Sequence, residues 1–116
     1  MAMPADAPTN STIVADYRAR TPGSAALFDR ARTLFPSGIT HDTRNLDPYP
    51  LYVQRGQGSR KWCVDGHEYV DYFGGHGALL LGHNHPQVVA ATQEALARGT
   101  HFGANHAGEV RWATLV

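Results

Sequence analysis

The stretch from Trp62 to Pro86 constrains the fold of this chain more than any other segment. It places the pair Asp65-Gly66 between two aromatic segments, followed by a glycine-rich bend, a short apolar run and the sequence Gly-His-Asn-His-Pro. An Asp-Gly pair is typical of a tight hairpin, because glycine adopts the positive φ that such a turn requires. Proline is well suited to the first position of a helix, where its missing N–H would have no partner. We therefore expect a hairpin, then a loop, then a helix.

Local patterns predict helices on both sides of a three-stranded antiparallel meander. Strands are expected over residues 51–54, 59–64 and 68–72, with Gly56-Gln57-Gly58 as the first turn and Asp65-Gly66 as the second. The four predicted helices span residues 12–20, 25–35, 86–98 and about 107 onward, with Ser11, Ser24 and His85 as caps of the first three. Residues 39–50 have no periodicity and are predicted to form an irregular but ordered loop.

Composition excludes several classes of protein. Ten basic residues balance ten acidic ones, so no broad electrostatic field favours nucleic acid or an anionic membrane as a partner. The longest apolar runs, such as Ala78–Leu81, are far shorter than the roughly 20 residues of a membrane span. Residues 1–11 are small and polar, with two prolines and no secretory signal, and are predicted to form a disordered tail. The single cysteine, Cys63, suits a reducing compartment, and we expect a cytoplasmic protein.

Three short motifs lie within or near the stretch described above: Pro-Ser-Gly-Ile-Thr-His-Asp-Thr-Arg at residues 36–44, Gly-Gly-His-Gly at 74–77 and Gly-Thr-His-Phe-Gly-Ala at 99–104. With these motifs, residues 27–116 resemble the N-terminal region of class III, pyridoxal-phosphate-dependent aminotransferases, most closely the glutamate-1-semialdehyde 2,1-aminomutases. Residues 36–44, Pro-Ser-Gly-Ile-Thr-His-Asp-Thr-Arg, have the length and final arginine of the family's Pro-Gly-Gly-Val-Asn-Ser-Pro-Val-Arg. Residues 74–77, Gly-Gly-His-Gly, stand where the family has Gly-Thr-Trp-Gly, and residues 99–104 resemble its Gly-Thr-Ser-Phe-Gly-Ala. The resemblance implies an α/β fold of the fold-type-I pyridoxal-phosphate transferases, in which this chain is the N-terminal α+β part.

The resemblance also implies three substrate-binding residues. Arg44 occupies the position of the arginine that binds the substrate carboxylate, and a guanidinium suits this role because it can donate two parallel hydrogen bonds. His76 replaces a tryptophan that walls the substrate pocket, which suggests an altered substrate. His41 replaces a serine near the substrate, and it either hydrogen-bonds the substrate or fills the loop. No catalytic or cofactor-binding residue is predicted within the chain.

The implied cofactor, pyridoxal 5'-phosphate, needs a lysine from a large domain, whereas the only lysine here is Lys61, inside a predicted strand. A final helix with uncovered Trp112, Leu115 and Val116 also indicates an opening piece of a longer enzyme. We expect residues 12–116 to be a small-domain segment that is inert alone. The complete enzyme is expected to be a homodimer that transfers an amino group on an amino acid or amino-ketone bearing a carboxylate. Aminomutase and aminotransferase reactions both remain open.

The seven histidines suggest an alternative, an independent histidine-rich module that binds metal or a protein partner and has no enzymatic activity. His83 and His85 would lie on one face of a strand. Zinc sites need three or four ligands, and no paired cysteines or neighbouring carboxylates complete the set. We therefore predict no metal site.

Overall fold

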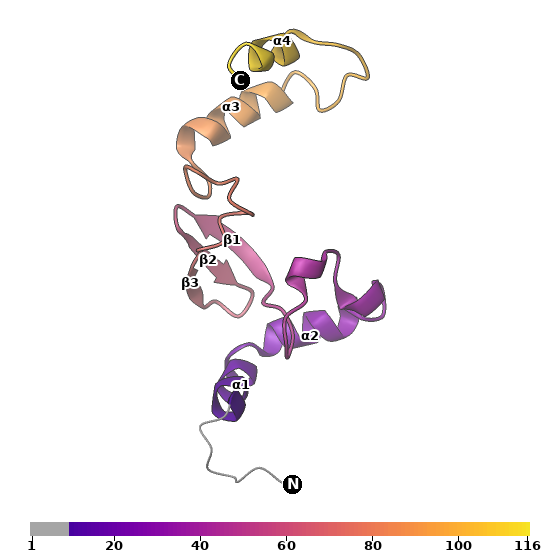
Figure 1. Cartoon of the computed structure of the whole chain (residues 1–116), viewed down its shortest axis with the longest axis vertical. Coiled ribbons are helices and arrows are strands. Elements are labelled where there is room, and N and C mark those ends of the chain that lie inside the picture. The colour runs from indigo at the N-terminus through magenta and orange to yellow at the C-terminus, as the bar shows by residue number, and fades with distance from the viewer. Residues whose placement is uncertain (1–9) are drawn as a thin grey trace. The chain divides into compact units, whose positions relative to one another are not determined.

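The computed structural model describes residues 10–116, which divide into two units at His83 (Figure 1). The first unit holds the helices α1 (Asn10–Arg20) and α2 (Pro22–Ala31), the 3-10 turns Pro36–Gly38 and Asp42–Arg44, and the strands β1 (Val53–Gln57), β2 (Arg60–Cys63) and β3 (Glu68–Val70). The second unit, Asn84–Val116, holds α3 (Pro86–Leu96) and α4 (Ala107–Ala113). The predicted tail, residues 1–11, lies outside the described residues except for its last two positions, which belong to α1.

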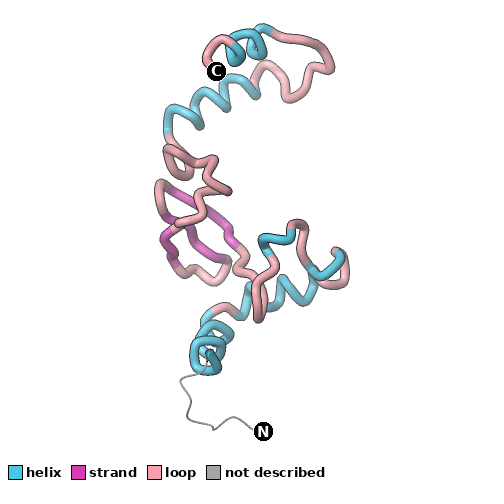
Figure 2. Tube along the Cα trace, viewed as in Figure 1, coloured by secondary structure: helices cyan, strands magenta, loops and turns pink. Residues whose placement is uncertain are grey.

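The three strands form the predicted antiparallel meander in the order β1-β2-β3 (Figure 2). The central strand is β2, in which Arg60 pairs with Gln57 of β1 and with Val70 of β3. The connection from β2 to β3 contains Gly66 at a φ of +85°. The prediction of a glycine turn at this place is therefore confirmed, and it joins two strands as expected.

The position predicted for the first turn was wrong. Strand β1 continues through Gly56 and Gln57, and the chain reverses at Gly58 and Ser59. Gly56 is not a turn residue but allows the His83 ring to pack closely against β1, because a Cβ atom there would lie 2.6 Å from Cγ of that ring. A glycine inside a strand often marks such a close approach. The turn falls at Gly58, whose φ is +54°.

The N-terminus of α2 is capped from the hairpin turn between β2 and β3. The helix begins at Pro22, earlier than predicted, and Ser24 lies inside it. The Asp65 carboxylate accepts hydrogen bonds from the backbone N–H of Gly23 at 2.6 Å, from that of Ser24 at 3.1 Å and from the Ser24 hydroxyl at 3.0 Å. These are N–H groups that a helix leaves unpaired at its start. Asp65, far from α2 in sequence, thus caps this helix in place of Ser24, the cap predicted from the sequence.

Two other helix boundaries differ from the prediction. The helix α1 begins at Asn10, so Ser11 lies within it. The helix α2 ends at Ala31, before Phe35. Phe35 is extended, with φ −123° and ψ 145°, because the ring of the following Pro36 disfavours helical backbone at the residue before it. The segment 39–50 is irregular as predicted, apart from the short turn Asp42–Arg44.

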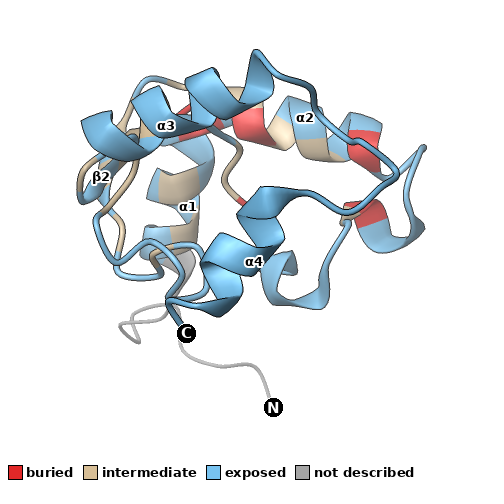
Figure 3. Cartoon of the chain, turned by 90° about the horizontal axis from the view of Figure 1, so that it is seen from above, coloured by how far each residue is buried: buried red, intermediate tan, exposed pale blue. Residues whose placement is uncertain are grey.

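The buried part of the first unit is small and partly polar, as the few red positions in Figure 3 indicate. Tyr49 and Thr21 are only 4% and 1% exposed, and their hydroxyl oxygens lie 3.0 Å apart. The Tyr17 hydroxyl donates to the Tyr49 carbonyl at 2.8 Å. Burial, with a further contribution from Tyr49, raises the pKa of Tyr17 to about 12. Hydrogen bonds between α1, the α1–α2 junction and the loop before β1 therefore hold these segments together.

In the second unit, α3 starts at Pro86 as predicted, and its C-terminal turn closes at Gly99, whose φ is +134°. The position predicted for the cap of α3 is confirmed, although this cap makes no side-chain hydrogen bond. His85 occupies the N-cap position, but its side chain makes no capping hydrogen bond, and its Nδ1 is buried with no partner among the described residues. The helix α4 starts at Ala107, inside the predicted range. Among residues 10–116, no helix has the length and apolar character needed to cross a membrane.

Candidate functional site

One of the three predicted substrate-binding residues, His76, lies on the glycine loop, which we define as residues 72–82. Both of its ends are tied to the turn between β1 and β2. Where the chain enters the loop, the N–H of Asp71 donates to the Ser59 carbonyl at 2.8 Å. Where it leaves, His83 and Gly58 exchange two backbone hydrogen bonds, each of 2.8 Å. The loop therefore starts and ends at neighbouring points on the rim of the meander.

A buried carboxylate closes the base of the glycine loop. The side chain of Asp71 is 4% exposed; its Oδ1 lies 2.9 Å from Nζ of Lys61, and its Oδ2 lies 2.6 Å from Nε2 of His83. Oδ1 also accepts a hydrogen bond from the N–H of Phe73 at 3.1 Å. An ionised carboxylate only accepts hydrogen bonds, so Nε2 of His83 carries the proton that it donates. The contacts with Lys61 and His83 hold the pKa of Asp71 well below its usual range, and they outweigh the opposing effect of burial.

The lowered pKa of Asp71 predicts acid sensitivity. An aspartate in an unfolded chain has a pKa of about 3.9. The contribution of Asp71 to the free energy of unfolding is therefore complete above about pH 4 and is lost as the pH falls toward the lower pKa of the folded state. We expect the stability difference between the native chain and Asp71→Asn to shrink between pH 5 and pH 2.5, measured by urea unfolding. A difference that stays constant over this range would contradict the assignment.

Two of the three predicted substrate-binding residues meet in the structure. The rings of His41 and His76, from separate loops, have centroids 5.5 Å apart and an interplanar angle of 65°. The ring of Phe73 packs edge-on against His76 at 4.4 Å. His76 has a φ of +62°, a left-handed backbone that is uncommon for residues other than glycine and that clusters at functional sites. The loop thus holds an imidazole in a strained position facing another imidazole.

The third predicted residue, Arg44, lies on the turn that His41 caps. Nδ1 of His41 accepts a hydrogen bond from the N–H of Thr43 at 3.3 Å and lies 2.9 Å from its hydroxyl. The N–H of Arg44 donates to the His41 carbonyl at 2.9 Å. Nη1 of Arg44 donates to the Thr40 hydroxyl at 2.8 Å, and no carboxylate among the described residues lies within ion-pair distance of this exposed guanidinium. Its remaining N–H groups can therefore bind a carboxylate from outside.

Sequence reasoning missed Asp71 and Phe73. A carboxyl group directly before a glycine-rich segment was an available signal. Its partners could not be identified locally, because antiparallel pairing of β2 with β3 brings Lys61 to it and the return of the glycine loop brings His83. The second residue, Phe73, is one of several aromatic residues in the segment, and nothing in the pattern singles it out.

The structure gives little support to the interpretation of the histidines as metal ligands. His83 donates to Asp71, and no group of three or more His, Cys, Asp or Glu side chains in residues 10–116 lies close enough together to hold a metal ion. A divalent metal site usually needs at least three such protein ligands.

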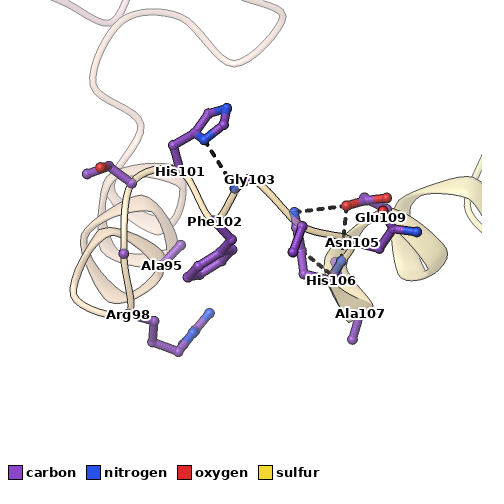
Figure 4. A pocket seen from close by; sticks show the side chains of 13 residues that line it. Ala95, Arg98, His101, Phe102, Gly103, Asn105, His106, Ala107 and Glu109 are labelled. Atoms are coloured by element: carbon purple, nitrogen blue, oxygen red, sulfur yellow. Dashed lines mark hydrogen bonds and ion pairs between the residues drawn. The ribbon is translucent and has the colours of Figure 1, made fainter.

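A cavity of about 820 Å³ follows the loop between α3 and α4 in the second unit (Figure 4). Several polar groups in it bond to their own loop. Nδ1 of His101 accepts from the N–H of Gly103 at 3.2 Å. Nδ1 of His106 accepts from the N–H of Gly108 at 3.1 Å, and Glu109 accepts from the N–H of His106 at 3.1 Å (Figure 4). These side chains shape the loop and cap α4.

The described residues do not fit covalent attachment of pyridoxal phosphate. Lys61 is the only lysine in the sequence, and its nitrogen is held 2.9 Å from the buried Asp71 carboxylate. To attack an aldehyde, this amine would have to leave the ion pair and strand a buried charge, which is costly. The network around Lys61 is therefore structural.

Comparison with known proteins identifies the family. The profile described as aminotransferase class-III matches residues 42–114. The glutamate-1-semialdehyde 2,1-aminomutase of Methanopyrus kandleri is 43% identical over 100 residues, which are 86% of this chain and 23% of that protein. The enzyme of the same name from Aeropyrum pernix is 47% identical over 94 residues, 80% of this chain and 22% of that protein. The chain thus spans about a quarter of the length of the curated relatives it matches.

Solved structures agree with this result. A transaminase with pyridoxal phosphate bound superimposes with a TM-score of 0.78 and 39% identity, over 81% of this chain and 22% of that one. The β-phenylalanine aminotransferase of Variovorax paradoxus gives 0.83 and 27%, over 92% and 26%. The predicted resemblance and fold class, a segment with helices and a three-stranded antiparallel sheet from a pyridoxal-phosphate-dependent transferase fold, are confirmed. This chain belongs to the class III aminotransferases.

Proposed function

We propose that this chain is the substrate-recognition segment of a class III aminotransferase or aminomutase that resembles glutamate-1-semialdehyde 2,1-aminomutase. The meeting of the two predicted loops is the observation that carries this proposal. Arg44 lies on the turn capped by His41, and the His41 ring faces His76 at 5.5 Å. An exposed guanidinium on a turn that is capped by one of two meeting imidazoles suits a substrate that bears a carboxylate.

Each residue has a distinct proposed role. Arg44 binds the substrate carboxylate through paired N–H donors, and this contact sets the orientation of the substrate. His76 forms part of the pocket wall and adds a polar ring edge to it. His41 holds the turn that carries Arg44 through its contacts with Thr43, and its ring supports His76. All three act by binding and orienting.

We further propose that residues 12–116 form part of a small domain and that a large domain elsewhere in the protein holds pyridoxal 5'-phosphate. The share of each relative that the chain covers, about a quarter, supports this division. The complete protein is proposed to be a cytoplasmic homodimer that acts on an amino acid or amino-ketone, with no nucleic-acid or membrane partner. The ten-to-ten charge balance agrees with this choice of partners.

Cofactor trapping tests whether the chain is inert alone. We expect pyridoxal phosphate and borohydride to leave no stoichiometric adduct on the 116-residue chain, because Lys61 is engaged by Asp71. The natural-length protein should retain one pyridoxyl group per subunit after reduction, measured by intact mass. The variant Lys61→Arg serves as the control and should retain the same group. A stoichiometric adduct on Lys61 in either protein would overturn the division between the two domains.

A further inference from the structure

We propose that Asp71 is a positioning residue that holds the glycine loop, and with it His76, in the geometry of the substrate site. The inference rests on the proposed function only where it treats His76 as facing substrate. The order of the loop itself does not depend on that function.

The carboxylate of Asp71 acts at the base of the loop. Its Oδ2 binds Nε2 of His83 at 2.6 Å, and these two residues directly flank the loop. This contact joins the two loop ends directly, whereas the backbone hydrogen bonds to Gly58 and Ser59 join each end to the meander. A compact loop with adjoining ends depends on such closing contacts for its order.

The same carboxylate also supports the turn that carries His76. Oδ1 of Asp71 accepts from the N–H of Phe73 at 3.1 Å. The carbonyl of Phe73 then accepts from the N–H of Gly77 at 3.1 Å, which closes a turn around His76. The Phe73 ring contacts the His76 ring at 4.4 Å. An unbroken series of contacts thus leads from Asp71 to the strained backbone of His76.

The meander holds the carboxylate itself in place. The ammonium of Lys61, on the central strand β2, lies 2.9 Å from Oδ1, and the Asp71 side chain is 4% exposed. The ring of His83 lies against Gly56 of β1, where a Cβ atom would come within 2.6 Å of the ring Cγ. The sheet therefore holds both partners of Asp71 in place, and their position determines where the loop lies.

Hydrogen exchange on the natural-length protein, read by peptide mass, tests this role. We expect Asp71→Asn and His83→Ala to speed exchange of residues 72–82 by about 10- to 100-fold while exchange of β1 and β2 stays within about 3-fold. The variant His83→Gln, which restores an N–H donor, should recover most of the protection. Glu68→Gln, which removes an exposed carboxylate of β3 paired with Arg60, is the matched control and should change nothing.

A second variant, at Gly56, disturbs the contact between Asp71 and His83 without replacing either residue. Gly56→Ala should displace the His83 ring and speed loop exchange as His83→Ala does. Unchanged loop exchange in both Asp71→Asn and Gly56→Ala would overturn the proposal. Equal acceleration across the loop and the meander would also overturn it, because Asp71 would then stabilise the whole unit and not the loop.

Kinetics separate this inference from the proposed function. If His76→Ala lowers kcat/KM for a carboxylate-bearing amino donor, Asp71→Asn should lower it by at least 10-fold as well, and normal activity in Asp71→Asn would overturn the positioning role. If His76→Ala has no effect while Asp71→Asn still loosens the loop, the loop-ordering role is supported and the proposed function of the loop fails.

Discussion

Replacing Asp65 with alanine is expected to lower the free energy of unfolding of the chain by about 2–3 kcal/mol. The change removes three hydrogen bonds, of 2.6, 3.1 and 3.0 Å, that hold the start of α2 to the hairpin turn. The side chain of Ser24 is fully buried, so its hydroxyl cannot replace the lost bond with one to solvent. The loss is large for a unit with so few buried side chains.

Urea unfolding followed by Trp62 fluorescence measures this effect, with Trp112→Phe as the background so that only the meander is observed. Asp29→Ala is the matched control. It removes a carboxylate of α2 that is 68% exposed and pairs with Arg32, so a change below about 0.5 kcal/mol is expected. Similar losses in Asp65→Ala and Asp29→Ala would refute the capping role. The pKa of Asp65 agrees with that role, since burial raises it but the hydrogen bonds from Gly23 and Ser24 outweigh burial and lower it.

The variant Arg44→Ala is expected to reduce kcat/KM of the complete enzyme for carboxylate-bearing donors by about 10- to 150-fold. This factor corresponds to the roughly 1.5–3 kcal/mol of a charge-assisted hydrogen-bond pair. Arg44 is exposed and its side chain donates to the Thr40 hydroxyl on the same loop, so the change should disturb the fold little. Steady-state kinetics with one amino donor and the same amine lacking its carboxylate provides the measurement.

The carboxylate-free amine is the internal control, because its rate should be the same in the native enzyme and in Arg44→Ala. The variant Arg44→Lys keeps the charge but not the planar pair of donors, so it should restore only part of the activity. Arg98→Ala, which removes an exposed arginine paired with Glu94 on α3, is the matched surface control. Equal losses for both donors would show that Arg44 acts on the structure of the loop and not on the carboxylate.

Much of the fold follows from short stretches of sequence. The pair Asp65-Gly66, the start of α3 at Pro86 and the meander of three strands are all predicted correctly from local patterns. Turn and helix-start preferences reside in one or two residues, so neighbours in sequence are enough to reveal them. The family could also be recognised at this level, because its motifs keep their spacing within residues 36–104.

Two of the features that were predicted wrongly, the cap of α2 and the first turn of the meander, share a cause. Serine is a residue type that often caps helices, yet Asp65 and not Ser24 caps α2. Glycine is a residue type that favours turns, yet Gly56 lies in a strand and makes room for the His83 ring. In both places a tertiary contact outweighs the local preference, which amounts to about 1 kcal/mol or less for most residues. Such contacts join residues far apart in the chain, and no pattern within one window contains both partners.

The candidate site, like the fold, could be predicted from the sequence only in part. The sequence by itself determined which residues we propose as substrate-binding, since Arg44, His41 and His76 are identified by residue type and motif position. Only the tertiary structure decided that the rings of His41 and His76 meet and that Asp71 closes the loop beneath them. The physical reason is that a side chain's chemistry belongs to one residue, whereas a contact also requires the backbone path that brings a second residue within about 3–6 Å.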